Sequence, residues 1–323
     1  MRKRYLKLSP QEWAQKMALA ASLAQPCHLC PRQCLVDRRQ LCGICQQGPL
    51  ALAHIQDHFG EEPFLVGAHG SAAFFFAGCN LRCVYCQNWE ISRGRLAKAQ
   101  VMTPAQLAGH FLAAQERAVS NINLVTPTIF LPDILQAIYL AAQQGLNLPI
   151  VYNTSSYESP AALALLADVV DIYLADFKYL TPALAQRYSA AVDYPAVALA
   201  ALKIMQQQVG GLIWRGELLH RGLVIRHLVL PEQTKEAQAI AALVKKEFPT
   251  AYFSLLAQYD PPCADPSFSK QFPELNRRLT SAEYADAWQA VTSRYHIGQE
   301  LAAANTWRPC FGQSGEDKFA HDD

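Results

Sequence analysis

Three cysteines follow one another at short intervals in the first third of the chain, at Cys79, Cys83 and Cys86. An iron–sulfur cube is normally held by four cysteine thiolates. The Cys-x3-Cys-x2-Cys spacing supplies only three, so a cube bound here keeps one iron without a protein ligand. An open coordination position distinguishes a reactive metal site from a closed structural one, as is established for zinc. The triad therefore predicts a reactive cluster that binds a further molecule.

Two other interpretations of the triad are a zinc knuckle and a set of buried free thiols, since unpaired cysteine is among the most buried residue types. Zinc sites usually draw four protein ligands from paired Cys-x2-Cys or Cys/His halves. No such pair follows the triad closely in the sequence. The spacing therefore favours the cluster over zinc.

A second cysteine group lies nearer the N-terminus, with the spacing Cys27-x2-Cys30-x3-Cys34-x7-Cys42-x2-Cys45. The segment has little helical periodicity and few residues that form a core, so a bound metal would supply the free energy that folds it. Zinc held by four thiolates and a second iron–sulfur cluster both fit such a set. Unligated thiols in a mobile arm are the third interpretation. The sequence predicts a metal here and leaves its identity open.

Length, composition and charge restrict the class of protein. The chain has 323 residues, 51% of them hydrophobic, which is enough for a large core. Its net charge of +1 gives no bulk attraction to nucleic acid or anionic lipid. The basic N-terminus is not followed by a signal-peptide apolar region, and no stretch approaches the roughly 20 apolar residues of a membrane span. We therefore expect a cytoplasmic globular protein without nucleic-acid or membrane partners, whose closely spaced cysteines are metal ligands.

Short apolar runs alternate with helical segments along the chain, a pattern typical of buried parallel strands. Between the runs, Thr103, Ser159 and Thr181 each precede a proline and so indicate a helix start. Strands joined by helices require right-handed crossovers and a parallel sheet. Six such units predict an α/β fold, an open partial (β/α)6 barrel. The runs are residues 74–76, 122–125, 150–152, 169–175, 223–230 and 252–256.

The expected organisation has three parts. Residues 1–57 form an N-terminal extension with the cysteine-rich metal-binding segment, residues 58–300 form the barrel, and residues 301–323 form a poorly ordered tail. Cys263 and Cys310 lie far from both cysteine groups in sequence. Isolated cysteines are usually inert packing residues, so we assign them no role.

Polar residues stand where the predicted strands end, and reactive residues of αβ barrels gather at those ends. An Asp or Asn after a strand is often only the cap of the next helix, so each of these residues alone is a weak indication. Arg226 is stronger, because an arginine in a buried strand needs a partner, and a carboxylate pairs with it at two positions. The strand-end residues are Asn153, Thr154, Asp176, Lys178, Arg226, His227, Gln258 and Tyr259.

The cysteine loop at 78–88, with an aromatic residue before its last cysteine, resembles the signature of the radical S-adenosylmethionine (SAM) superfamily. In that superfamily the free iron binds the amino and carboxylate groups of SAM, and an electron from the cluster releases a 5'-deoxyadenosyl radical. The segments 83–88, 176–178 and 225–231 are similar to motifs of pyruvate formate-lyase activating enzyme. Segments 58–63 and 152–158 resemble more closely a subgroup of activating-enzyme-like proteins whose reactions are poorly characterised. The resemblance covers residues 27 to about 295.

The resemblance implies roles for individual residues. Tyr85 and Asn88 would lie against the adenosine, although they also fit a core side chain and a helix cap. Asp176 and Lys178 would lie near the methionine carboxylate, and Arg226 would be a further polar contact. In the relatives the matching N-terminal ligands are Cys27, Cys30, Cys34 and Cys42, which leaves Cys45 as an extra cysteine.

Two departures from the family pattern concern the specific activity. The family often carries Gly-Gly-Glu-Pro after the second strand, where this chain has residues 123–128. Contact with the substrate amino group must then come from backbone carbonyls or from Thr126 and Thr128. Asn153 and Thr154 take the place of an Asp-Thr pair that helps to hold a monovalent cation. The asparagine removes one negative charge, so the resemblance does not imply cation dependence.

The predicted function is reductive cleavage of SAM at a 4Fe–4S cluster on the three-cysteine triad, followed by abstraction of a hydrogen atom from a substrate. A donor such as flavodoxin or ferredoxin would supply the electron. If the resemblance extends to the substrate, the hydrogen comes from a glycine of a glycyl-radical-type partner protein; the alternative is a small molecule or another peptide. Two alternatives come from other functional classes. An iron–sulfur electron-transfer protein would require four ligands per cluster, and a zinc-dependent nucleic-acid-binding arm would require a basic face with aromatic residues.

Overall fold

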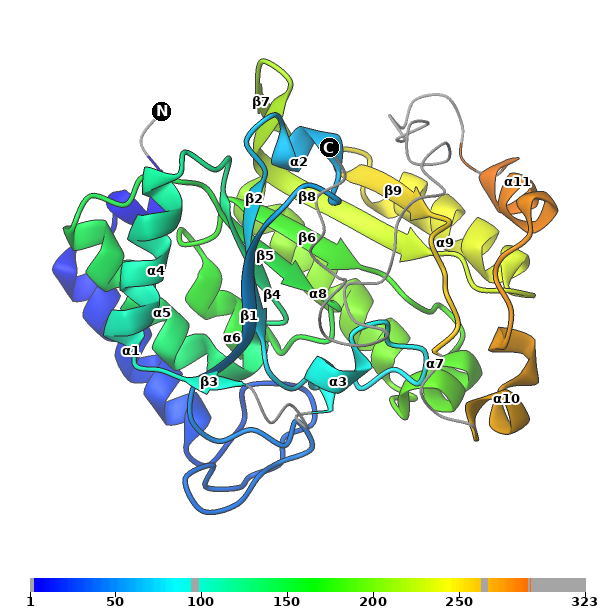
Figure 1. Cartoon of the computed structure of the whole chain (residues 1–323), viewed down its shortest axis with the longest axis horizontal. Coiled ribbons are helices and arrows are strands. Elements are labelled where there is room, and N and C mark those ends of the chain that lie inside the picture. The colour runs from blue at the N-terminus through cyan, green and yellow to red at the C-terminus, as the bar shows by residue number, and fades with distance from the viewer. Residues whose placement is uncertain (1–2, 94–98, 263–266, 290, 292–323) are drawn as a thin grey trace.

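The computed structural model describes residues 3–93, 99–262, 267–289 and 291. Its strands are β1 (Ala51–His58), β2 (Ser71–Phe76), β3 (Gln100–Val101), β4 (Ile122–Val125), β5 (Ile150–Thr154), β6 (Ile172–Asp176), β7 (Ile213–Arg215), β8 (Leu218–Leu228) and β9 (Tyr252–Leu256). In this described part of the chain they form one mixed sheet in the order β3-β1-β2-β4-β5-β6-β8-β7, with β9 also paired to β8 (Figure 1).

The parallel strands of this sheet are those that the sequence predicts. β2, β4, β5, β6, β8 and β9 pair in that order, so that Leu124 lies between Phe74 and Tyr152. β4 and β9 have the predicted bounds, whereas β8 begins earlier because its first residues form a hairpin with β7. Every residue of β2, β5 and β9 is buried, as is typical of parallel strands that are covered on both faces. The predicted α/β fold is confirmed, and the described strands follow the open path of a partial barrel.

Antiparallel strands extend the sheet beyond the predicted repeat. β1 pairs antiparallel with β2, and β3 pairs with β1. β1 crosses the predicted boundary between residues 57 and 58, so the N-terminal extension contributes a strand to the barrel sheet. Sequence reasoning did not identify β1 because it mixes His54, Gln56 and Asp57 with apolar residues. Most of its residues are only half-buried, as is usual for a strand near a sheet edge.

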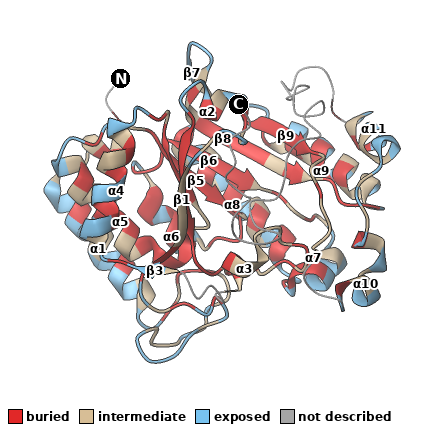
Figure 2. Ribbon diagram, in the orientation of Figure 1, coloured by how far each residue is buried: buried red, intermediate tan, exposed pale blue. Residues whose placement is uncertain are grey.

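The helices lie along the sheet, and most connect one parallel strand to the next. They are α1 (Pro10–Ala24), α2 (Pro63–Val66), α3 (Trp89–Ser92), α4 (Pro104–Glu116), α5 (Leu131–Gln143), α6 (Pro160–Leu166), α7 (Pro182–Ser189), α8 (Tyr194–Val209), α9 (Thr234–Glu247), α10 (Phe268–Gln271) and α11 (Ser281–Gln289). Figure 2 shows buried residues concentrated in the strands and the adjoining helix faces, with exposed residues on the outside. α1 packs on α5 and α6. None of the helices described has the length and apolar character that crossing a bilayer would require.

Two of the predicted helix starts have the expected caps. Thr103 and Gln106 form a reciprocal capping box at the start of α4. At α6 the Ser159 hydroxyl accepts the N–H of Ala162 at 3.1 Å. Each cap satisfies an N–H group that the helix itself leaves without a partner.

The third helix start is held differently. α7 begins at Pro182 as predicted, but Thr181 does not cap it through its side chain. Instead, the Thr181 hydroxyl donates to Glu236 on α9 at 2.7 Å. The same carboxylate accepts the N–H groups of Leu180 and Thr181. A contact between two helices therefore replaces the expected local cap.

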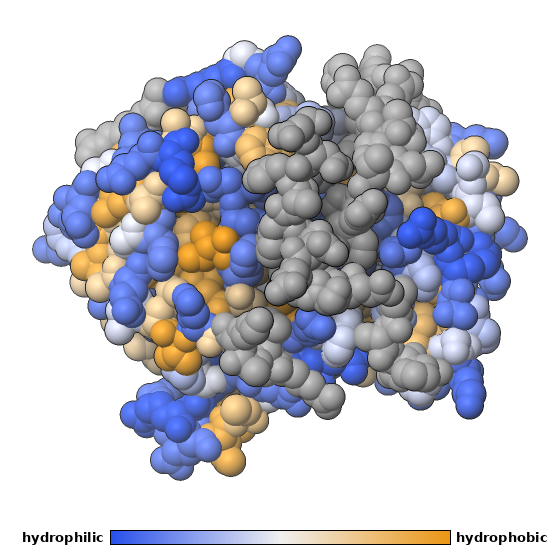
Figure 3. Space-filling model, viewed as in Figure 1, coloured by the Kyte–Doolittle hydropathy of each residue, from blue (hydrophilic) through white to orange (hydrophobic). Residues whose placement is uncertain are grey.

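Residues 25–50, between α1 and β1, form a cysteine lobe at the lower edge of the molecule in Figure 1. Apart from a bridge between Ala24 and Cys27, the lobe has no regular strand or helix in the described structure. In Figure 3 it protrudes and carries a hydrophobic patch beside hydrophilic atoms; Leu35, Leu41 and Ile44 are its exposed apolar residues. Cys263, Cys310 and the tail predicted at 301–323 lie outside the described residues.

Candidate functional site

A cavity of about 250 Å³ lies at the carboxyl ends of the parallel strands. Its wall combines the loop after β2 with the ends of β4, β5, β6, β8 and β9, which is where the reactive residues of αβ barrels gather. The structure brings together all the candidate residues that the sequence identified in the barrel as catalytic or cofactor-binding. They are Cys79, Cys83, Cys86, Tyr85, Asn88, Thr126, Asn153, Thr154, Asp176, Lys178 and Arg226.

The cysteine loop leaves β2 at Gly78. This glycine has a φ of +82°, a conformation that other residues rarely adopt. A Cβ atom at this position would lie 2.6 Å from the carbonyl oxygen of Cys45 in the cysteine lobe. Glycine is therefore required both by the turn and by the close approach of the lobe.

The three thiols have different polar neighbours. The N–H of Leu81 points to Cys79 Sγ at 3.4 Å, and Ser189 Oγ donates to Cys83 Sγ at 3.1 Å. Burial raises the pKa of Cys79 to about 12 and also raises the pKa of Cys86. A bound metal ion reverses this effect, because a coordinating thiol is deprotonated outright. These thiols are therefore expected to lose their protons when a metal binds and not before.

Tyr85 lines the cavity and also fastens the cysteine loop to the barrel. Its ring makes edge contacts with Tyr179, Tyr188 and Tyr259, with centroid distances between 6.2 and 6.4 Å. Asn88 occupies the N-cap position of α3 but makes no side-chain hydrogen bond to that helix. The alternative role of Asn88 as a side-chain helix cap is therefore not realised in the structure.

Arg226 is the centre of a polar cluster on one wall of the cavity. Its Nε donates to Asp176 Oδ1 at 2.9 Å, its Nη1 to Glu61 Oε2 at 2.7 Å and its Nη2 to Asn153 Oδ1 at 2.8 Å. Lys178 Nζ donates to the other oxygen of Asp176 at 2.7 Å. Arg226 has the predicted carboxylate pairing, but not through one carboxylate bonded at two positions: Asp176 and Glu61 each accept one bond from the guanidinium. The guanidinium thus contacts Asn153, which stands at the position of the aspartate in the family's cation-holding Asp-Thr pair.

Electrostatic interactions keep Asp176, Lys178 and Arg226 charged. Burial alone would raise the pKa of Asp176, but the charges of Lys178 and Arg226 outweigh burial and hold the pKa below its usual value. Burial also opposes the charged forms of Lys178 and Arg226, and the Asp176 carboxylate nevertheless raises both pKa values. Lys178 and Arg226 are therefore permanent cations in the cavity wall, and both are paired with the Asp176 carboxylate.

Glu61 and Glu62 belong to the site, although sequence reasoning assigned them no role. Glu61 lines the cavity and bonds both Arg226 and Asn153. The buried Glu62 lies 3.9 Å from Arg226 Nη1, and burial raises its pKa to about 7. The sequence contained one indication of these carboxylates: Arg226 lies in a buried strand and therefore needs a carboxylate partner. The 165 positions that separate Glu61 from Arg226 hid which carboxylate it was.

The two threonines in the segment that replaces Gly-Gly-Glu-Pro have different surroundings. Thr126 lines the cavity. Thr128 is buried and donates to Glu158 Oε1 at 2.6 Å, an oxygen that also accepts the Thr154 hydroxyl at 2.5 Å. Burial raises the pKa of Glu158 to about 7. The arrangement favours Thr126 as the hydroxyl available to a bound amino group.

Strand alternation separates Arg226 from its neighbour His227, because successive side chains point to opposite faces. His227 is buried, and its Nδ1 contacts the carbonyl of Phe177 at 2.8 Å. Burial lowers the pKa of His227 to about 4, so the imidazole is neutral. Gln258 lines the cavity, whereas Tyr259 donates its hydroxyl to a backbone carbonyl outside it.

The cysteine lobe encloses a smaller cavity of its own, lined by Cys27, Cys30, Cys34 and Cys45 among other residues. Cys42, which the resemblance included among the ligands, is exposed and is not one of the lining residues. The described cysteines are all free thiols. In the described residues, no group of three or more Cys, His, Asp or Glu side chains is arranged so that it could hold a metal ion as it stands.

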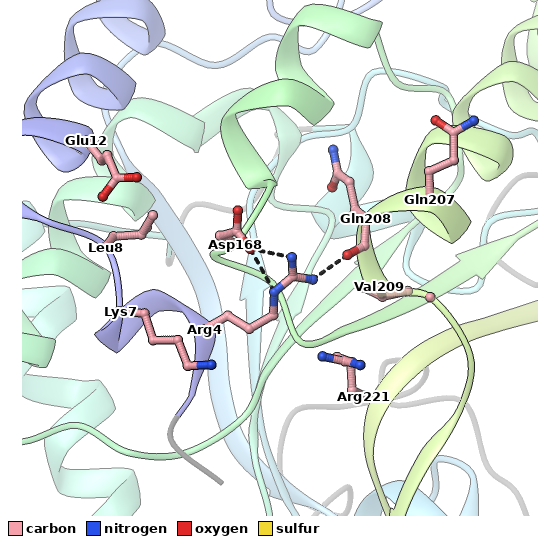
Figure 4. A pocket seen from close by; sticks show the side chains of 10 residues that line it. Arg4, Lys7, Leu8, Glu12, Asp168, Gln207, Gln208, Val209 and Arg221 are labelled. Carbon is pink, nitrogen blue, oxygen red and sulfur yellow. Dashed lines mark hydrogen bonds and ion pairs between the residues drawn. The ribbon is translucent and has the colours of Figure 1, made fainter.

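Figure 4 shows another cavity, which lies around Arg4 and contains none of the candidate residues. The Arg4 guanidinium donates to Asp168 and to the carbonyl oxygen of Gln208. Asp168 precedes the parallel strand β6, so the cavity lies at the amino ends of the parallel strands, which in αβ barrels serve stability. Arg4 ties the N-terminal segment to the barrel.

The main cavity has the donor set for a cluster with a bound amino acid moiety. Its cysteine sulfurs are ligands that iron–sulfur clusters use. Lys178 and Arg226 provide positive charge for a carboxylate, and the Thr126 hydroxyl provides a polar contact for an amino group. These residues fit the cofactors that the sequence predicts.

Comparison with known proteins gives two findings. The family model described as "Radical SAM superfamily" matches residues 74–244, a stretch that contains every candidate residue of the main cavity named from the sequence. The chain is also 29% identical over 292 residues to "Uncharacterized protein MJ0674" of Methanocaldococcus jannaschii. That match covers 87% of this chain and 78% of the archaeal protein.

Proposed function

Because this chain belongs to the radical SAM superfamily and is an enzyme of that class, we propose that Cys79, Cys83 and Cys86 hold a 4Fe–4S cluster. The iron that these thiolates leave free would bind SAM. The observation that carries this proposal is the meeting of all three cysteines with two cations and an amide in one cavity. An electron-transfer cluster with four protein ligands binds no further molecule and would not require these polar residues beside it.

The methionine end of SAM is the part that the polar cluster would recognise. Among the described contacts, the hydrogen-bond partner of Lys178 Nζ is Asp176, and an ammonium has three donors. Lys178 therefore retains N–H groups for the methionine carboxylate. Asp176, Glu61 and Asn153 fix the Arg226 guanidinium, so its charge is positioned before the ligand arrives. Such preorganisation reduces the cost of ordering side chains on binding.

The adenosine end would lie beside the cysteine loop. Tyr85 presents a ring that its tyrosine neighbours hold in place, and Asn88 has an amide without a capping bond to α3. Val125, Leu228 and Leu256 add apolar lining to the same cavity. Apolar walls exclude water from a reactive site and so limit side reactions.

The protein's own contribution is to bind, orient and shield. When bound, the cluster would supply the electron that splits the sulfonium of SAM, and the deoxyadenosyl radical would take a hydrogen atom from the substrate. Flavodoxin or ferredoxin is the class of donor that we propose for the electron. Both are small redox proteins of low potential.

The proposal is tested by anaerobic reconstitution with iron and sulfide, reduction in the presence of SAM, and chromatography for 5'-deoxyadenosine. We expect this product from the natural chain. Replacement of Cys79, Cys83 and Cys86 by alanine should abolish it, because the cluster loses its ligands. Cys42→Ala, which removes an exposed cysteine outside the main cavity, should leave product formation unchanged. Product from the triple variant would show that the cluster site has been assigned wrongly.

For the substrate, we propose a glycine backbone of a glycyl-radical-type partner protein, and the support is the likeness of segments 83–88, 176–178 and 225–231 to the activating-enzyme motifs. A small molecule or another peptide is the alternative. The test uses cell extract labelled with glycine that is deuterated at the α-carbon, divided into macromolecular and small-molecule fractions. Deuterium in 5'-deoxyadenosine with the macromolecular fraction supports the proposal. Transfer from the small-molecule fraction alone would contradict it.

A further inference from the structure

We propose that Cys27, Cys30, Cys34 and Cys45 form a second thiolate metal centre, with Cys45 as fourth ligand in place of Cys42, and that this centre fixes the start of the cluster-binding loop. The proposal does not depend on SAM chemistry, because it concerns a different cavity. The four cysteines line that cavity together. Four thiolates are a complete ligand set for zinc or for an iron–sulfur cluster.

The backbone of the lobe explains how the first three cysteines come to one cavity. The N–H of Cys27 donates to the carbonyl of Val36 at 3.0 Å, and the N–H of Leu35 donates to the carbonyl of Cys27 at 3.1 Å. These bonds close residues 27–36 into a loop. Cys30 and Cys34 lie inside that loop, so their thiols face the same space as Cys27.

A turn at residues 43–46 brings the fourth cysteine to the cavity. The N–H of Gln46 donates to the carbonyl of Gly43 at 2.9 Å. Cys34 Sγ lies against Gly43, where a Cβ atom would be only 3.0 Å from the sulfur. The N–H of Ile44 also points to that sulfur at 3.5 Å. Backbone N–H groups aimed at cysteine sulfur are among the contacts by which proteins tune metal-bound thiolates.

Burial distinguishes Cys45 from Cys42, although the two are only three positions apart. Cys45 is 8% exposed, close to Cys27 at 9% and Cys30 at 7%, whereas Cys42 is among the exposed residues. The turn directs Cys45 inward and leaves Cys42 in solvent. A zinc ion bound by these four cysteines would hold each sulfur at about 2.3 Å.

The same lobe contacts the loop that carries the reactive cysteines. Arg32, between Cys30 and Cys34, donates to the carbonyls of Asn80 at 3.0 Å and Leu81 at 3.4 Å. Arg82 in turn donates to the carbonyl of Ile44 at 3.4 Å. Asn80 lines the lobe cavity as well. The centre therefore lies against residues 78–82, and its loss would release the backbone that precedes Cys83.

The first test measures metal content in a chain whose Cys79, Cys83 and Cys86 are alanine, so that the lobe holds the remaining cysteine cluster of the described residues. After anaerobic reconstitution, we expect about one zinc, or iron with matching sulfide, per chain, and either result supports the centre and identifies its metal. Added Cys42→Ala should leave the content unchanged, and added Cys45→Ala should reduce it at least severalfold. No bound metal, or loss with Cys42→Ala but not with Cys45→Ala, would overturn the ligand set.

The second test follows backbone hydrogen exchange of residues 78–83 by mass spectrometry in chains that keep the reactive triad. Cys45→Ala should accelerate exchange there severalfold, because the lobe no longer holds the loop. Cys42→Ala is the matched control and should leave exchange as in the natural chain. Unchanged exchange in a Cys45→Ala protein that has lost the lobe metal would overturn the positioning role. Neither test measures SAM cleavage. A negative result would therefore contradict the second metal centre without contradicting the proposed function.

Discussion

Arg226 shows how much a single side chain contributes to the candidate site. Its guanidinium bonds Asp176, Glu61 and Asn153, which come from three separate parts of the chain. The side chains of Arg226, Glu61 and Asp176 are 13%, 15% and 23% exposed, so the ion pairs are largely removed from water. Removing one partner of a buried ion pair is costly because the remaining charges lose their compensation.

Arg226→Ala should therefore lower the free energy of unfolding by about 3 to 5 kcal/mol. Chemical denaturation under anaerobic conditions measures this change. The matched control is Arg117→Ala, which removes an arginine that is bidentate to Asp57 but 45% exposed, and which should cost less than about 1 kcal/mol. Equal losses in the two variants would show that burial does not govern the Arg226 cluster.

Glu158 is a second residue whose environment has a measurable consequence. Burial raises its pKa to about 7, above the ordinary value of 4.5. The folded state therefore binds a proton that the unfolded state releases between these pH values. The stabilisation of the folded state by this protonated carboxyl group is complete below about pH 4.5 and is lost as the pH rises through about 7.

Glu158→Gln should remove this pH dependence, because the amide does not titrate and still accepts hydrogen bonds from Thr128 and Thr154. Between about pH 5 and pH 7.5, the natural chain should lose about 2 to 3 kcal/mol more stability than the variant. Denaturation curves at several pH values measure the difference. Parallel curves for the two proteins would contradict the raised pKa.

At the scale of residues, the sequence predicted the cysteines and most of the polar residues of the main cavity, but not Glu61. Spacing identified the cysteine triad, and position at strand ends identified Asp176 and Lys178. Glu61 was missed because its partner Arg226 is 165 positions away, and no local pattern encodes such a pairing. Cys42 and Cys45 differ in exposure because of a turn whose direction spacing does not specify.

At the scale of elements, periodicity predicted the parallel strands and missed the antiparallel ones. Strands buried on both faces are continuous apolar runs, which are easy to recognise. β1 is only half-buried and has a mixed composition, and β7 has three residues. Helix starts with a local cap were also predictable, whereas the start of α7 depends on Glu236 from another helix.

Glu236→Ala should consequently destabilise the start of α7 although it lies on α9. The variant loses a carboxylate that accepts two backbone N–H groups and a hydroxyl, and we expect a cost of about 1 to 2 kcal/mol. Glu247→Ala on the same helix is the control, because its ion-pair partners Lys203 and Lys246 are 49% and 80% exposed and these pairs should contribute less than about 1 kcal/mol. Thermal or chemical denaturation compares the two, and a smaller loss for Glu236→Ala would contradict the capping role.

At the scale of the whole molecule, one sheet supports both cysteine groups. The reactive loop leaves β2, and the cysteine lobe connects α1 to β1, the antiparallel neighbour of β2. Arg32 and Arg82 join the two segments through backbone carbonyls. This arrangement places the lobe beside the reactive loop while each group keeps its own cavity. No composition or charge pattern in the sequence encodes that proximity.

The central claim is that the triad holds a cluster with one iron free for SAM. Mössbauer spectroscopy of the anaerobically reconstituted, isotopically enriched protein tests it most directly, in spectra recorded with and without SAM. We predict that SAM changes the signal of one iron in the cluster, because that iron gains new ligands while the three cysteine-bound irons keep theirs. A cluster whose four irons do not respond to SAM, or zinc in its place, would contradict the account.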